Sequence, residues 1–234
     1  MHRKDSDVKI AIAFLLAALF VCAAPAANTL DVYVIDVEGG KALLVVSPSG
    51  ESLLVDAGWP GYNGRDVDRI VEAAKAAGLK QIDYFVASHL DLDHIGDVPL
   101  LISRFPIRHI LDNGPLQTTG KGVEGRYKTY AEVRDKMDHA AVKPGDRIPI
   151  KGVDVQVVAA GRKVIDQPLK GAGAPNPACA TASQPDEIKA DLEDNMSIGL
   201  LYTLGKFRML DLADLEAHFE HELACPVNLG SVKQ

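Results

Sequence analysis

The chain has 234 residues, of which 47% are hydrophobic and 24% are charged, and these values predict a globular protein with one domain. The formal net charge is −7 at pH 7, and Lys and Arg are scattered rather than gathered in a basic stripe. An acidic surface repels polyanions, which argues against binding to nucleic acid and favours a small-molecule substrate. The sequence does not indicate an oligomeric state.

The first 26 residues have the pattern of a secretory signal peptide. Basic residues precede the apolar run 10–24, which is shorter than the roughly 20 residues that span a membrane. Ala24-Pro25-Ala26 then offers a cleavage site with small residues. An uncleaved N-terminal anchor is the alternative. Cleavage would remove three basic and two acidic residues, which changes the formal charge from −7 to −8. We therefore expect an exported protein, periplasmic or secreted, whose mature chain 27–234 forms the domain without a membrane span.

The first part of the mature chain alternates predicted strands and helices. Alternating hydrophobicity separated by Gly-rich turns indicates strands, and apolar residues at helical spacing indicate a helix that ends at Gly78. The predicted elements are strands over 30–37, 41–47 and 51–56, a helix over 67–77, a buried strand over 82–87, a helix over 97–104 and a strand over 107–111.

Four side chains able to bind metal follow the strand 82–87 within six residues: His89, Asp91, Asp93 and His94. A strand that ends in a loop can direct alternate side chains at one point, so the first three can converge while His94 reaches a neighbouring centre. That geometry suits two metal ions. The alternative is an ordinary polar turn, but the spacing of all four residues favours the metal site.

The second part of the chain predicts further hairpins and helices. Its elements are a loop over 112–125, a helix over 126–139, a hairpin of 146–150 with 153–159, a long Gly- and Pro-rich loop over 161–187, a hairpin of 197–204 with 206–212, and a helix over 214–223. The long loop predicts either a functional flap or a disordered segment. Hairpins interrupted by helices favour helices that lie outside two packed sheets.

Two cysteines remain in the mature chain, Cys179 in the long loop and Cys225 near the C-terminus. Export to an oxidising compartment favours a disulfide between them, which would tie the loop to the end of the chain. Two unpaired buried thiols are the alternative, since the sequence does not give their separation.

The pattern H-x-D-x-D-H-x-G over residues 89–96 resembles the metal-binding signature of the metallo-beta-lactamase superfamily, H-x-H-x-D-H, with Asp91 in place of the middle histidine. The segments 34–42 and 53–58 resemble the opening strands of its competence-protein branch, which is associated with DNA uptake. The resemblance implies an α+β fold, a four-layer αββα sandwich. It leaves unassigned the segment 194–197, which stands where that branch has an Asn-Ser segment.

The resemblance also implies the roles of the site residues. A strand that ends in Gly-Asp-Leu supplies the aspartate that bridges both ions, and Asp214 stands at that place, with a helix N-cap as its alternative role and Asp211 as a less favoured bridge. His89 and Asp91 would hold the first ion, and Asp93 and His94 the second. Asp93 is also the predicted catalytic residue, because it can orient the nucleophile or take up a proton.

Two divalent ions are the expected cofactors. Zinc is the preferred ion. Manganese and iron are alternatives, because an oxygen donor in place of a nitrogen shifts the metal preference of the site toward harder metals. Asp56 is expected either to accept a hydrogen bond from a ligand histidine or to cap a turn.

The end of the chain departs from the resemblance. There the related proteins continue with a strand that ends in His-His-Gly, so we expect an incomplete second sheet and a missing ligand. His218 and His221 are a less favoured substitute, because solvent-facing histidines on a charged helix are the simpler account.

The resulting hypothesis is an exported metal-dependent hydrolase that uses a metal-activated water. The alternatives are a truncated, catalytically impaired relative that acts as a binding module, and a metal-dependent phosphodiesterase or nuclease.

Overall fold

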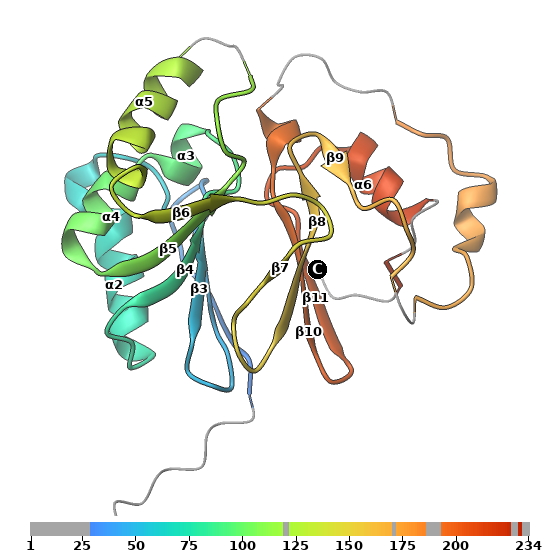
Figure 1. Cartoon of the computed structure of the whole chain (residues 1–234), viewed down its shortest axis with the longest axis horizontal. Helices are drawn as coiled ribbons and strands as arrows, with labels where there is room; N and C mark the ends of the chain where they lie inside the picture. Colours follow the sequence, from blue (N-terminus) through green and yellow to red (C-terminus); the bar gives the residue numbers. More distant parts are fainter. Residues whose placement is uncertain (1–28, 119–121, 170–171, 186–192, 226–228, 231–234) are drawn as a thin grey trace, which may run out of the picture.

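The computed structural model describes residues 29–118, 122–169, 172–185, 193–225 and 229–230. Two β-sheets face each other, and helices cover the outer face of each sheet (Figure 1). This is the predicted α+β fold of the αββα type. The predicted signal peptide, residues 1–26, lies outside the described residues.

The first sheet has six strands in the order β1-β2-β3-β4-β5-β6. Neighbouring strands from β1 to β3 are antiparallel, whereas β3, β4, β5 and β6 run parallel. Parallel neighbours need crossover connections, and helices supply them here. The strands are β1 (Asp31–Val34), β2 (Leu43–Val46), β3 (Ser52–Val55), β4 (Ile82–Val86), β5 (Ile107–Asp112) and β6 (Asp138–Ala141).

The helices that follow these strands pack on the outer face of the first sheet (Figure 1). In α2 the side chains of Val67, Ile70 and Ala74 are buried, at the spacing of one helical face, as the sequence predicted. The helices of this layer are η1 (Tyr62–Gly64), α2 (Arg65–Ala76), α3 (Leu92–Ile95), α4 (Val98–Arg104) and α5 (Val123–Arg134).

The second sheet has five strands in the order β11-β10-β8-β7, with β9 paired to β8. Leu201 of β10 packs against Phe219 and Leu223, which places α6 on the outer face of this sheet. Its elements are β7 (Arg147–Ile148), β8 (Asp154–Ala160), β9 (Lys163–Val164), η2 (Pro177–Ala180), η3 (Asp194–Met196), β10 (Gly199–Leu204), β11 (Phe207–Asp211) and α6 (Ala217–Ala224).

A second core, beside the one under the helices of the first sheet, lies between the two sheets. Alternate residues of each strand point inward, so Val45 and Leu53 of the first sheet meet Val157 and Leu200 of the second. Each of these four side chains is fully buried. At about 25 cal/mol per Å² of buried apolar surface, this contact layer is the main source of stability between the sheets.

The structure corrects the helix predicted over 126–139. The helix α5 covers 123–134, and residues 138–141 form the edge strand β6, parallel to β5. All four residues of β6 are exposed, so the strand lacks the alternation of buried and exposed positions by which sequence reasoning recognises strands. The helix therefore ends earlier and begins three residues earlier than the pattern indicated.

Cys179 and Cys225 form a disulfide, which confirms the first of the two alternatives for these residues. It joins the loop that contains η2 to the end of α6, with a Cα–Cα distance of 5.4 Å. The predicted loop 161–187 contains β9 and η2, and part of it lies outside the described residues. Within the described part of the chain, no helix is both long enough and apolar enough to cross a bilayer.

Candidate metal centre

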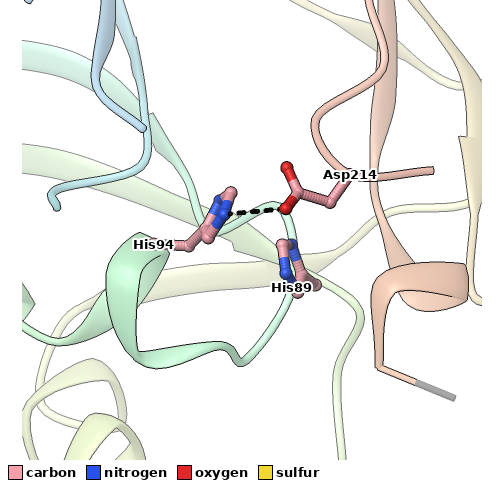
Figure 2. Close-up of side chains that lie close together, drawn as sticks. All are labelled: His89, His94 and Asp214. Atoms are coloured by element: carbon pink, nitrogen blue, oxygen red, sulfur yellow. Dashed lines mark ion pairs between the residues drawn. The ribbon is translucent and has the colours of Figure 1, made fainter. Parts of the chain in front are cut away.

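The predicted site residues come from two loops at the same end of the sandwich. His89 and His94 lie in the segment between β4 and α4, and Asp214 lies between β11 and α6. Figure 2 shows the three side chains pointing toward one another across the space between the two halves. Their potential ligand atoms all lie within 4.8 Å of one another. Since β4 and β11 belong to different sheets, only the folded sandwich brings these residues together.

His94 is fixed by a buried carboxylate. Its Nδ1 lies 2.8 Å from Asp56 Oδ2, and Asp56 also accepts hydrogen bonds from the Ser88 main-chain N–H (2.8 Å) and the Ser88 hydroxyl (2.7 Å). Asp56 follows β3 and Ser88 follows β4, so the parallel pairing of these strands places them at one edge. The contact to His94 agrees with the expected acceptor role of Asp56. Because Nδ1 donates to the carboxylate, Nε2 is left to face the candidate centre.

The second nitrogen of His94 faces the carboxylates of Asp214 and Asp93. Nε2 lies 3.4 Å from Asp214 Oδ2 and 3.7 Å from Asp93 Oδ2. Burial disfavours the charged imidazole, but Asp214 and Asp56 outweigh it and raise the pKa of His94 to about 10. The hydrogen bond from His94 in turn lowers the pKa of Asp214. In the absence of an ion, a proton therefore occupies the position that a cation would take, and binding an ion must release it.

A second group of donors lies around His89. His89 Nε2 is 3.9 Å from Asp91 Oδ2 and 3.8 Å from Asp194 Oδ1, and the three residues form a set able to hold one ion. Its Nδ1 lies 3.1 Å from the hydroxyl of Ser88 and 3.4 Å from that of Ser197. Sequence reasoning did not assign Asp194 to the site. The signal was its position just before a predicted strand of the second sheet, in a segment left without a role.

Asp93 lies beside His94, and its carboxylate is 22% exposed. Its main-chain carbonyl accepts a hydrogen bond from the Lys41 N–H over 3.1 Å. A Cβ on Gly40 would lie 2.3 Å from that carbonyl oxygen, so residue 40 has to be glycine for the two loops to approach. This close approach holds the Asp93 backbone while its side chain reaches toward His94.

The structure distinguishes the roles considered for Asp214 and Asp211. Glu216 is the N-cap residue of α6, so Asp214 does not cap the helix. Asp211 forms an ion pair with Lys41 and accepts a hydrogen bond from the Ala213 N–H (3.2 Å). Asp214 is therefore the carboxylate of this segment that faces His94. Ala213 adopts a left-handed backbone with φ 52°, at the place where the related pattern has glycine.

The histidines of α6 do not join these groups. His218 lies 3.4 Å from Glu222 Oε1, and its Nδ1 is 3.1 Å from the Pro185 carbonyl. Among the described residues, neither His218 nor His221 belongs to a set of side chains able to hold an ion. The suggested replacement of a missing ligand by either histidine thus finds no support.

Two further contacts secure the loops that carry the donors. The buried carboxylate of Glu193 accepts a hydrogen bond from the Leu90 N–H over 2.8 Å and another from the Thr118 hydroxyl. Asn195 Nδ2 donates to Glu216 Oε2 over 2.7 Å. The first contact joins η3 to the loop after β4, and the second joins it to the start of α6. All three ligand-bearing segments are therefore connected to one another.

The donor set fits divalent cations. It combines two imidazoles with the carboxylates of Asp91, Asp194 and Asp214, and such mixed nitrogen and oxygen donors suit zinc, manganese and iron. The predicted ligand Asp93 belongs to neither set of converging donors, although its Oδ2 lies 3.7 Å from His94 Nε2. When no ion is bound, carboxylates that face one another repel each other, and an imidazole beside them retains a proton, as His94 does. The arrangement is therefore that of a candidate centre for two ions.

Comparison with known families agrees with this geometry. The family model described as the metallo-beta-lactamase superfamily matches residues 35–183, more than half of the chain. The chain belongs to the metallo-beta-lactamase superfamily. The matched residues include the cluster from His89 to His94, whereas Asp194 and Asp214 lie beyond them.

The individual relatives match only part of this chain. The chain is 30% identical over 112 residues to a coenzyme F420H(2) oxidase of Methanothermobacter marburgensis and 30% identical over 100 residues to that of Methanocaldococcus jannaschii. These matches cover 48% and 42% of this chain but only 26% and 22% of the relatives. Among solved structures, the metallo-beta-lactamase fold protein YhfI of Bacillus subtilis has a TM-score of 0.46 at 16% identity, with 79% of this chain and 62% of that chain covered.

Proposed function

We propose that the chain is a metal-dependent hydrolase with a centre for two divalent ions. The observation that carries the proposal is the convergence of His89, His94 and Asp214 from two different sheets, with their potential ligand atoms within 4.8 Å. The first ion would be held by His89, Asp91 and Asp194, and the second by Asp93 and His94, with Asp214 between them. Asp194 is added to the set that the sequence indicated.

The bound ions would supply Lewis acidity, which lowers the pKa of water and polarises the bond under attack. The residues of the chain do the remaining work. Asp56 holds the hydrogen on His94 Nδ1, so that Nε2 remains a donor atom. Asp93, whose Oδ2 lies 3.7 Å from His94 Nε2, orients the attacking water or takes up its proton.

The ions are proposed to be zinc first, with manganese or iron as alternatives. The carboxylates beside the two imidazoles give an oxygen-rich donor set, which binds harder ions than an all-histidine set would. The likeness to coenzyme F420H(2) oxidases covers about a quarter of those proteins, so it does not extend their activity to this chain.

The substrate is proposed to be a small molecule with an ester, lactone, amide or phosphodiester bond. The net charge of −7 supports a small substrate over nucleic acid, although the likeness of residues 34–42 and 53–58 to the competence-protein branch keeps phosphodiesters among the candidates. Export to the periplasm or the medium is part of the proposal, and the disulfide between Cys179 and Cys225 supports it.

The test is hydrolysis by purified protein loaded with Zn²⁺ or Mn²⁺. A panel of model esters, lactones and phosphodiesters should include at least one that is hydrolysed, and His94→Ala should abolish that activity. His139→Ala is the matched control, because His139 is an exposed histidine on β6, and it should retain wild-type activity.

Two other results would favour the alternatives. Ion binding without turnover of any substrate would favour an impaired relative that acts as a binding module. Metal-dependent nicking of plasmid DNA would favour the nuclease, against the expectation from the acidic surface.

A further inference from the structure

Arg126, on α5, contacts the loop after β4 at two adjacent points. Its Nε donates to the Leu90 carbonyl over 2.7 Å, and its Nη2 donates to Asp91 Oδ1 over 2.8 Å. The two side chains of the ion pair are 23% and 25% exposed, so water screens them only in part. The donors of a guanidinium project at fixed angles, which allows one arginine to fix both acceptors together.

This contact determines which oxygen of Asp91 faces the candidate centre. Oδ1 accepts from Arg126, whereas Oδ2 lies 3.9 Å from His89 Nε2, on the side where Asp194 also approaches. A carboxylate can bind an ion through one oxygen or through both. With Oδ1 held by the guanidinium, Asp91 offers its Oδ2 as a single donor atom. An imidazole nitrogen offers a single donor atom in the same way.

Charge gives a second reason to consider the pair as a unit. Asp91 stands at the second ligand position of the signature, where the usual residue is a neutral histidine. The aspartate therefore adds a negative charge to the site. Arg126 adds a positive charge 2.8 Å from it. The pair together is neutral, as the histidine would be.

We propose that Arg126 is a positioning residue that makes Asp91 a single-atom, charge-balanced donor to the first ion. The inference rests on the proposed function, because it requires an ion beside His89. Arg126 itself acts through Asp91 and the Leu90 carbonyl. A helix far along the chain thus takes part in the site, and it compensates for the replacement of histidine by Asp91.

The experiment measures the affinity for each ion by titration of the apo protein with Zn²⁺ against a chelating dye. Arg126→Gln should weaken binding of one of the two ions by about 10- to 100-fold, the usual effect of removing a partner of a ligand. Arg126→Lys, which keeps the charge but not the two fixed donors, should recover only part of that loss. The control is Lys128→Gln, which removes a positive charge from an exposed position of the same helix and should bind both ions as the wild type does.

The decisive comparison repeats Arg126→Gln in an Asp91→His background. A neutral histidine needs no charge balance and binds a given ion through only one nitrogen. In this background, Arg126→Gln should therefore change the affinity for the ion by less than about twofold. The d–d absorption of the Co²⁺-loaded proteins gives a readout that is independent of affinity. It should weaken on Arg126→Gln only when Asp91 is present, because a second carboxylate oxygen raises the coordination number.

Equal losses in both backgrounds would show that Arg126 stabilises the fold around α5, and would overturn the inference. Wild-type affinity and absorption of Arg126→Gln would overturn it as well, while leaving the two-ion centre intact. If neither the wild type nor Lys128→Gln binds ions, the proposed function fails and the inference fails with it. Thermal unfolding of each apo variant identifies any variant that does not fold, and Arg126→Lys then carries the comparison.

Discussion

The two sides of the candidate centre differ in how firmly they are held. On the side of the first sheet, His89 and His94 are 1% and 2% exposed, and a buried carboxylate fixes His94. On the side of the second sheet, the Asp214 carboxylate is 48% exposed, and the Asp214 N–H donates to the Ser197 hydroxyl over 3.3 Å. The two imidazoles are thus buried and preorganised, whereas the Asp214 carboxylate is half exposed.

On the side of the second sheet, the disulfide ties the end of α6 to the loop with η2, and its removal should have the largest effect on stability. Cys179 and Cys225 are separated by 46 residues, and closing a loop of that length stabilises a fold by about 4 kcal/mol in the chain-entropy account. Replacing both cysteines by serine should lower the free energy of unfolding in urea by about that amount. Affinity for the ion on the side of His94 should change by less than about twofold.

Reduction of the wild type should reproduce this loss of stability, and it should leave the double serine variant unchanged. A loss of ion binding as large as that caused by His94→Ala would contradict the comparison, since the first-sheet side would then depend on the second.

Asp97, a buried carboxylate that directly follows the loop 89–96, should make the stability of the protein depend on pH. Asp97 is 3% exposed, and burial, followed by repulsion from Asp66, raises its pKa to about 6. A carboxyl group whose pKa is raised on folding stabilises the fold below its unfolded pKa of about 4, and the stability is lost as pH rises through about 6. Asp97→Asn should therefore be more stable than the wild type by roughly 2–3 kcal/mol at pH 7.5.

Urea unfolding at pH 4 and at pH 7.5 measures this difference. At pH 4 the two proteins should be nearly equally stable, because the carboxyl group is mostly protonated in the folded wild type. A constant difference at both pH values would show that the effect of Asp97→Asn does not come from ionisation.

The buried hydrogen bond to His94 should set ion affinity on the side of the first sheet. Asp56→Asn removes the charge that orients the imidazole, and it should weaken binding of the ion at His94 by about 10- to 100-fold. Asp83→Asn is the matched control. Asp83 is a buried carboxylate of the same sheet that accepts from Ser52, and its loss should reduce stability without reducing ion affinity. Equal affinity losses in both variants would remove Asp56 from the site.

The smallest effect is expected at Ala213, beside Asp214. Ala213 has φ 52°, a conformation that costs an L-residue roughly 1–2 kcal/mol and costs glycine almost nothing. Ala213→Gly should stabilise the protein by up to about 1 kcal/mol, because the greater freedom of glycine in the unfolded chain offsets part of the gain. A decrease in thermal stability would show that the local backbone is not strained.

The same contrast explains what the sequence could predict. His89 to His94 lie in one short stretch after a buried strand, so periodicity and spacing located them together with the first sheet. Asp194 was missed because its proposed role depends on η3 lying beside the loop after β4, which Glu193 brings about through its hydrogen bond with Leu90, a contact distant in sequence. The exposed strand β6 was missed because no alternation marks an edge strand without a buried face.

The proposed centre holds two ions between the sheets, and both ions share Asp214. Anomalous diffraction from crystals grown with Zn²⁺ or Mn²⁺ would locate them. We expect two peaks about 3.5–4 Å apart, one against His89, Asp91 and Asp194 and the other against Asp93 and His94, with the Asp214 carboxylate between them. Density without a peak at these side chains, or an Asp214 carboxylate turned away from both histidines, would contradict this proposal.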